Sequence, residues 1–366
     1  MANLEDYIKW RGDLSFKISP FNEIDNMILA RFSYMPFKRI KMEPKETIES
    51  IANKMKDFDE DKFGFHGDRE MCQLMGNSER FKRLVVTDFE ENNDKKTEKQ
   101  FSAITIHLPE RTIYLSFNGT DNSIVGWKED FNMSFMENVP SQLEGAEYTK
   151  RIATKYKNTK ILLGGHSKGG NIAVYSAIAC GKRIQNRIKK VINCDGPGFD
   201  KTIVESENYK NIIDKVFTYI PQDSIIGRIL EHEEKYDIVL SNAKGIYQHD
   251  IHSWQVEGTK VVTVDKLTNN SDTINQTLRA YLKNTTPEQR KMFVGIVYEI
   301  IESTNVSTFK EFSKVWIQKL PTIFKTYKNI NEEDKKMMTQ MVVEFFKTGN
   351  QVFKDNKKEN KKKIGE

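Results

Sequence analysis

Short apolar runs separated by polar turns fill the middle of the chain. They predict strands at 83–88, 101–108, 112–117, 159–163, 190–194, 215–220, 236–240 and 260–264. Helical patterns lie between some of these strands but not between all of them. The alternation predicts an α/β fold with a largely parallel sheet and a mixed, partly antiparallel region.

Helical spacing takes over at both ends of the chain. After Ser19-Pro20, the residues Ile24, Met27, Ile28 and Phe32 keep the spacing of one helix face. Beyond residue 266, apolar pairs recur through 292–301 and 337–346, and Thr286-Pro287 marks a helix start. We therefore expect an N-terminal helical segment packing on the core (1–75), an α/β core (76–265), a C-terminal helical segment (266–353) and a disordered tail (354–366).

The C-terminal helices and the lysine-rich tail leave two interpretations open. The helices pack against the core, or they present an apolar face to a membrane surface or a partner. The tail is typical of a solvated end without aromatic residues, so we expect no nucleic-acid partner.

Composition narrows the class of protein. The 366 residues include 38% hydrophobic and 30% charged residues with a net charge of +5, which indicates a globular domain. No window of 18 uncharged apolar residues and no secretory signal is found, so we expect no transmembrane segment. Cys72, Cys180 and Cys194 lack metal-ligand spacing and cannot all pair, which favours a reduced cytoplasmic protein without metal or other cofactor.

The stretch LGGHSKGGN at 163–171 combines glycines, a serine and a lysine. A phosphate-binding P-loop needs lysine before the hydroxyl residue, and here Ser167 precedes Lys168. Gly165-His-Ser-Lys-Gly169 instead satisfies G-x-S-x-G, and it lies between an apolar strand pattern and a helix rich in small residues. That context predicts a nucleophile elbow with Ser167 at its apex. The alternative is an ordinary strand-to-helix turn with a capping serine.

A serine nucleophile requires an acid and a base farther along the chain. Asp195, Asp223 and Asp250 are the candidate acids, and we favour Asp223, which follows a strand farther along the sheet. The alternative for Asp223 is an Asx-turn or helix cap. His249 and His252, in YQHDIHSW, are the candidate bases.

The other histidines receive structural roles. We expect His166, next to the serine, to pack or hydrogen-bond locally. His66, His107 and His232 are expected to be ordinary surface or core residues, and the six histidines show no zinc-ligand spacing.

An oxyanion hole requires two donors. The amide of Lys168, which follows the nucleophile, is the first. The amide or hydroxyl of Thr120, after the strand that ends near Asn118-Gly119, is the second. A plain Asn-Gly turn is the alternative for that segment.

These motifs resemble known lipases. Phe117-Asn-Gly-Thr120, Trp127 and Asp130 are similar to the F-R-G-T … D-W … D stretch of class 3 (fungal-type) lipases, and GHSKGG at 165–170 is similar to their G-H-S-L-G-G elbow. A closer resemblance covers nearly the whole chain and concerns a bacterial family of lipase-like α/β hydrolases catalogued as a domain of unknown function. Its motifs here are DYIKWRGDLSF, PFNEIDNMIL, FNGTDNSIVGWKEDFNMSF, GGHSKGGNIAVYSA, CDGPGF, SIIG and QHDIHSW.

The resemblance implies an α/β-hydrolase fold with serine-esterase chemistry. It implies Asp223 as the triad acid and His249 as the base, with His252 as runner-up. Asn118 stands where the lipases have arginine and Lys168 where they have an apolar residue, so triglyceride specificity does not carry over.

The leading hypothesis is a serine hydrolase that cleaves a small-molecule or lipid carboxylic ester through an acyl-enzyme on Ser167. Two alternatives remain open. One is an acyltransferase with the same triad, and the other is a non-catalytic binding module. The sequence leaves the oligomeric state and the head group of the substrate open.

Overall fold

The computed structural model describes residues 2–120, 124–306 and 315–364, and the chain divides into two compact units. Unit 1 comprises Met1–Thr120 and Pro140–Leu267, and unit 2 comprises Asp121–Val139 and Thr268–Glu366. The expected N-terminal segment and α/β core thus form a single unit. Residues 121–139, expected within the core, group instead with the C-terminal helices.

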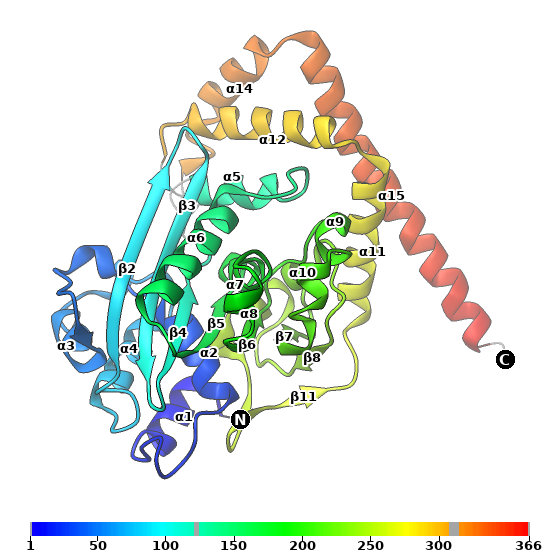
Figure 1. Cartoon of the computed structure of the whole chain (residues 1–366). Coiled ribbons are helices and arrows are strands. Elements are labelled where there is room, and N and C mark those ends of the chain that lie inside the picture. Colours follow the sequence, from blue (N-terminus) through cyan, green and yellow to red (C-terminus); the bar gives the residue numbers. More distant parts are fainter. Residues whose placement is uncertain (1, 121–123, 307–314, 365–366) are drawn as a thin grey trace. The chain divides into compact units, whose positions relative to one another are not determined.

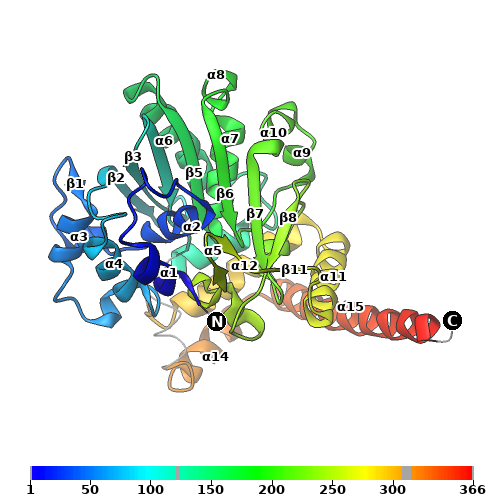
Figure 2. The same ribbon diagram turned by 90° about the horizontal axis from the view of Figure 1, so that it is seen from below.

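Unit 1 is built on a sheet that confirms the predicted mixed topology. Among the described residues its order is β1-β2-β3-β4-β5-β6-β7-β8-β11, and most of these strands are seen side by side in Figure 2. The neighbours from β4 to β8 are parallel, whereas β1 to β4 and the pair β8/β11 are antiparallel. The bounds are β1 Glu46–Thr47, β2 Val85–Asp94, β3 Lys99–Leu108, β4 Thr112–Phe117, β5 Lys160–His166, β6 Ile188–Cys194, β7 Val216–Pro221, β8 Tyr236–Val239 and β11 Thr263–Val264.

One predicted strand is divided in the structure. The run at 260–264 becomes β10 (Lys260–Val261), which pairs with β9 (Val256–Glu257), followed by β11 in the large sheet. Val262 leaves both ladders: its N–H donates to Gln255 and its carbonyl accepts from Leu240. The backbone groups of the break are therefore satisfied by neighbouring segments.

Both faces of the sheet are covered. Successive side chains of a strand point to opposite sides, and the two sets belong to two different buried clusters. In β3, Ile104 and Ile106 belong to one buried cluster, whereas Phe101 and Ala103 belong to the other. The first cluster includes residues of α1 (Leu4–Arg11), α2 (Glu23–Phe32), α3 (Ile48–Lys54) and α4 (Asp68–Asn77). The second includes α6 (Pro140–Lys155) and α7 (Lys168–Ala179), both labelled in Figure 1.

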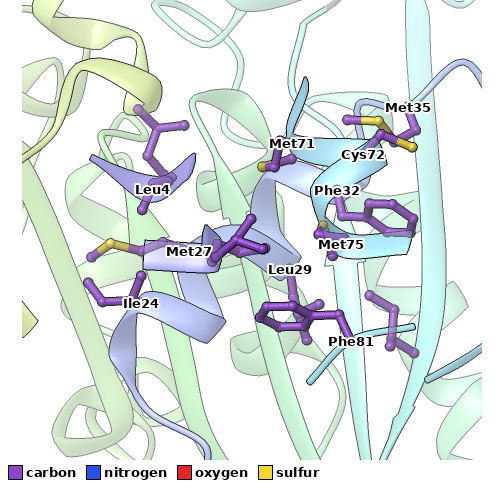
Figure 3. Packing of buried hydrophobic residues seen from close by; sticks show 14 of the residues in the cluster. Leu4, Ile24, Met27, Leu29, Phe32, Met35, Met71, Cys72, Met75 and Phe81 are labelled. Atoms are coloured by element: carbon purple, nitrogen blue, oxygen red, sulfur yellow. The ribbon is translucent and has the colours of Figure 1, made fainter. Parts of the chain in front are cut away.

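The N-terminal helices are an integral part of unit 1. Figure 3 shows their methionine, leucine and phenylalanine side chains meeting in the first cluster, among them Met27, Phe32 and Met75. Asn3 and Asn22 each close a capping box at the start of α1 and α2, which satisfies the first free amides of both helices.

Unit 2 is helical in the residues described. It contains α5 (Ile124–Asn132), α11 (Asn269–Asn284), α12 (Pro287–Glu302), α14 (Leu320–Asn329) and α15 (Glu332–Ile364). Thr286 caps α12 as the sequence predicts, with Pro287 in the first turn. Lys128 of α5 places its Nζ 3.9 Å from the centre of the Tyr298 ring of α12, which joins the inserted segment to the C-terminal helices.

The expectation of a disordered tail at 354–366 is wrong for most of that segment. α15 continues to Ile364, and residues 365–366 lie outside the described part of the chain. Lysine and glutamate are good helix formers, and a helix begun at Glu332 extends without a second nucleation step. None of the described helices is both long and apolar enough to cross a membrane.

Candidate active site

The turn between β5 and α7 holds Ser167 in a strained conformation. Its backbone angles are φ 56° and ψ −133°, which side-chain-bearing residues rarely adopt. A Cβ on Gly165 would lie 2.2 Å from the backbone of Gly169, and one on Gly169 would lie 2.2 Å from the carbonyl of Phe117. The glycines therefore permit the close approach that the turn requires. Ser167 is half-buried, whereas its neighbours from 161 to 170 are buried.

Asp195 is the carboxylate that the structure places on His249. Its Oδ2 lies 2.6 Å from Nδ1 of His249, and its side chain is buried. Oδ1 accepts hydrogen bonds from the Ser224 hydroxyl (2.5 Å) and the Gly227 amide (3.1 Å). These two donors fix the carboxylate so that its second oxygen faces the imidazole.

The strand order explains why Asp195 reaches this position. It follows β6 directly, and β6 is the neighbour of β5 in the sheet. The amide of Ser167 donates to the carbonyl of Cys194 at 2.8 Å, so the residue before Asp195 is hydrogen-bonded to Ser167. The signal in the sequence was the position of Asp195 immediately after a strand, in CDGPG.

Asp223, the favoured acid, forms hydrogen bonds with Gly245 and Gln248 of the loop that carries His249. Its Oδ2 accepts from the amide of Gly245 (2.8 Å) and from Nε2 of Gln248 (3.1 Å), while its own amide donates to Oε1 of Gln248 (2.9 Å). Nδ1 of His249 is hydrogen-bonded to Asp195 and not to Asp223. Asp223 therefore secures the His249 loop, defined here as residues 245–253.

His249 ends the 3₁₀ helix η5 (Gly245–His249) within the His249 loop. Its ring lies 4.6 Å from the ring of His166, centre to centre, and its carbonyl oxygen lies 2.6 Å from Nε2 of His166. Because His166 directly precedes Ser167, this contact brings the imidazole of His249 to the turn that holds Ser167. The side chain of His249 is 22% exposed, whereas that of Asp195 is 1% exposed.

His252, the runner-up base, has a different environment. It is buried between Glu5 of α1 and Asp68 of α4, with its Nε2 3.0 Å from Oδ1 of Asp68 and its Nδ1 hydrogen-bonded to Glu5. Burial by itself lowers the pKa of His252, but the hydrogen bonds to Asp68 and Glu5 raise it to about 9. His252 is therefore a buried cation between two carboxylates.

The raised pKa of His252 predicts a loss of stability in alkaline solution. A histidine whose pKa rises from 6.5 to about 9 on folding stabilises the folded state below its unfolded pKa and loses that contribution as pH rises through about 9. The charges that face it are Glu5, Asp68 and, with the opposite sign of effect, Arg31 of α2. The expected contribution is on the order of 3 kcal/mol.

Urea unfolding of the wild type and of His252→Gln, from neutral pH to beyond pH 9, measures this contribution. The difference in free energy of unfolding between the two proteins should shrink as the pH rises, because His252 loses its proton. Lysine and tyrosine titrations are common to both proteins and cancel in the difference. A pH-independent difference would contradict a charged His252.

The two expected oxyanion donors come from different segments of unit 1. Lys168 is the first residue of α7, and Thr120 is a half-buried residue three positions beyond β4. The Lys168 side chain is buried and donates from Nζ to Oε1 (2.7 Å) and the carbonyl (3.2 Å) of Gln100. Nε2 of Gln100 donates in turn to the carbonyl of Gly119 at 3.3 Å. Lys168 and Gln100 thus support, from inside the protein, the segment that leads to Thr120.

No cluster of three or more histidine, cysteine, aspartate or glutamate residues in the described ranges has a geometry suited to a metal ion. Asp195 was among the candidate acids of the sequence but was not the favoured one. The contributions of Gln100 and Glu5 to this region were not singled out from the sequence, since each depends on a contact between segments far apart along the chain.

The protein has a lipase-like α/β-hydrolase fold. Its features are the largely parallel sheet, the helices that cover both faces of that sheet, and the strained serine between β5 and α7. The chain belongs to the Mbeg1-like family, whose model matches residues 75–299. These findings confirm the resemblance that the sequence motifs carry.

Solved structures with a similar fold are fungal lipases. The native Rhizomucor miehei lipase–propeptide complex is 14% identical over 59% of this chain and 67% of that chain, with a TM-score of 0.38. Lip2 lipase from Yarrowia lipolytica is 11% identical over 64% and 83% (TM-score 0.37), and a lipase from Rhizopus microsporus var. chinensis is 11% identical over 68% and 81% (TM-score 0.38). No curated protein matches the chain in sequence.

Proposed function

We propose that the protein is a serine hydrolase that cleaves carboxylic esters through an acyl-enzyme on Ser167. The observation that carries the proposal is the Asp195–His249 pair held against the strained nucleophile turn. We assign Ser167 as nucleophile, His249 as base and Asp195, in place of Asp223, as the orienting acid.

The proposed reaction has two halves. His249 takes the proton from the Ser167 hydroxyl as its oxygen attacks the ester carbonyl carbon, and the resulting imidazolium gives that proton to the departing alcohol. Water then attacks the acyl-enzyme by the same proton path and releases the carboxylic acid. Asp195 keeps the proton of neutral His249 on Nδ1, which leaves Nε2 as the accepting nitrogen, and it stabilises the imidazolium when that forms.

The amides of Lys168 and Thr120 are the proposed donors to the oxyanion of the tetrahedral intermediate. A buried polar contact through Gln100 holds the two segments together, which supports this role. We place the substrate among small-molecule or lipid esters.

Labelling with a fluorophosphonate tests the proposal, because the reagent phosphonylates only an activated serine. The wild type should be labelled, and Ser167→Ala and His249→Ala should not. His252→Gln is the matched control, because it replaces the other histidine of the same loop. This variant should still be labelled at neutral pH. A folded wild type that is not labelled, or a Ser167→Ala protein that is, would be incompatible with the proposed chemistry.

A further inference from the structure

His166, the residue before the nucleophile, is a buried histidine that the proposed reaction does not use. It ends β5 with 1% of its surface exposed. Its Nε2 lies 2.6 Å from the carbonyl oxygen of His249, an atom that only accepts hydrogen bonds. The proton of the neutral ring is therefore on Nε2, and His166 donates to the backbone of the base.

The charge state of His166 agrees with this geometry. Burial lowers the pKa of His166 well below 6.5, and the charges of His249 and Arg31 lower it further. A neutral ring with its proton on Nε2 leaves Nδ1 as an acceptor. The single hydroxyl proton of Tyr34 faces two acceptors of His166, the carbonyl oxygen at 2.9 Å and Nδ1 at 3.3 Å.

Tyr34 comes from the N-terminal segment and is itself held rigidly. The guanidinium of Arg31 lies 4.1 Å from the centres of both the Tyr34 and Phe65 rings. Arg31 is buried and forms a bidentate pair with Asp68, at 2.6 and 2.8 Å. A cation stacked on two rings and fixed by a buried carboxylate leaves Tyr34 little freedom.

The hydroxyl of Tyr34 also touches the segment that leads to the proposed oxyanion donor. A Cβ on Gly119 would lie 2.0 Å from that hydroxyl oxygen and 2.7 Å from the carbonyl of His166. Tyr34 and His166 therefore link three segments of the proposed site: β5, which precedes Ser167, the Gly119–Thr120 segment, and the His249 loop.

We propose that Tyr34 and His166 are positioning residues that hold His249 and the Gly119–Thr120 segment against Ser167, so that the N-terminal segment completes the active site. This role rests on the function proposed above. Tyr34, Arg31 and Asp68 all lie outside the residues 75–299 that the family model matches, and the reacting groups depend on them through His166.

The test compares His166→Leu, His166→Gln and Tyr34→Phe with the wild type in hydrolysis of a chromogenic ester. A displacement of about 1 Å of a catalytic group costs on the order of 10²-fold in rate, so His166→Leu should lower kcat by about that factor with little change in KM. The glutamine amide reproduces the donor at Nε2, so His166→Gln should recover about tenfold of the loss. Tyr34→Phe, which removes one hydroxyl, should lower kcat about tenfold.

Tyr209→Phe is the matched control, because it removes another buried hydroxyl of unit 1, which bonds to Glu234 and the amide of Glu233 and to none of the proposed site residues. It should lower stability without changing kcat. If His166→Leu does not fold, Tyr34→Phe decides the question. A kcat for Tyr34→Phe equal to that of the wild type, or a His166→Gln no better than His166→Leu, overturns the inference. A wild type that is never labelled by fluorophosphonate removes the proposed function and this role together, so the two failures are distinguishable.

Discussion

Replacing Asp195 with asparagine is expected to lower kcat about 10⁴-fold, whereas replacing Asp223 with asparagine should change it only several-fold. The first substitution keeps an oxygen for the Ser224 hydroxyl and the Gly227 amide, so the surrounding loop keeps its donors. It presents an amide NH₂ to Nδ1 of His249. The imidazole then carries its proton on the nitrogen that must accept the serine proton, and the base is disabled without loss of the fold.

Asp223→Asn is the matched control because it makes the same chemical change one strand farther along the sheet. Its carboxylate accepts from Gly245 and Gln248, and an asparagine oxygen still accepts from the Gly245 amide. Rates of ester hydrolysis, with unfolding measured in parallel, separate the two. A 10⁴-fold loss in Asp223→Asn with a small loss in Asp195→Asn would return the acid to Asp223.

The largest effect on stability is expected from Arg80→Met, which should lower the free energy of unfolding by about 3–5 kcal/mol. Arg80 is fully buried and pairs with Asp25 of α2 at 2.7 and 2.5 Å. Its guanidinium also donates to the carbonyls of Leu14, Ser19 and Pro20. Its removal leaves the buried Asp25 carboxylate without a cationic partner and three backbone carbonyls without this donor.

Urea unfolding measures the change, and Lys9→Met is the surface control. Lys9 and Glu70 form an ion pair whose side chains are 50% and 56% exposed, so its loss should cost less than about 1 kcal/mol. The double variant Arg80→Met/Asp25→Leu should regain part of the loss, since it also removes the isolated charge. Equal effects of Arg80→Met and Lys9→Met would show that the buried pair is not what joins α2 to the loop before it.

Local pattern was sufficient for much of this protein. The strand at 112–117 was predicted with the bounds of β4, and Thr286-Pro287 marked the start of α12, because period and capping are encoded by adjacent residues. The glycines around Ser167 likewise predicted the tight turn, since the turn leaves no room for a Cβ at the positions two residues before and after Ser167. The helical part of the tail was missed because a charged composition is compatible with both a coil and the end of a long helix.

The sequence by itself determined the α/β class, the family motifs and the serine at the turn. Only the tertiary structure decided which carboxylate meets His249 and which residues hold that histidine in place. Asp195 and Asp223 both follow a strand, and nothing local separates them. The pairing of β6 with β5 places Asp195 beside the turn that holds Ser167, whereas Asp223 accepts hydrogen bonds from the His249 loop. The Tyr34–His166 and His166–His249 contacts join residues 132 and 83 positions apart, and the folded chain alone brings such residues within hydrogen-bond distance.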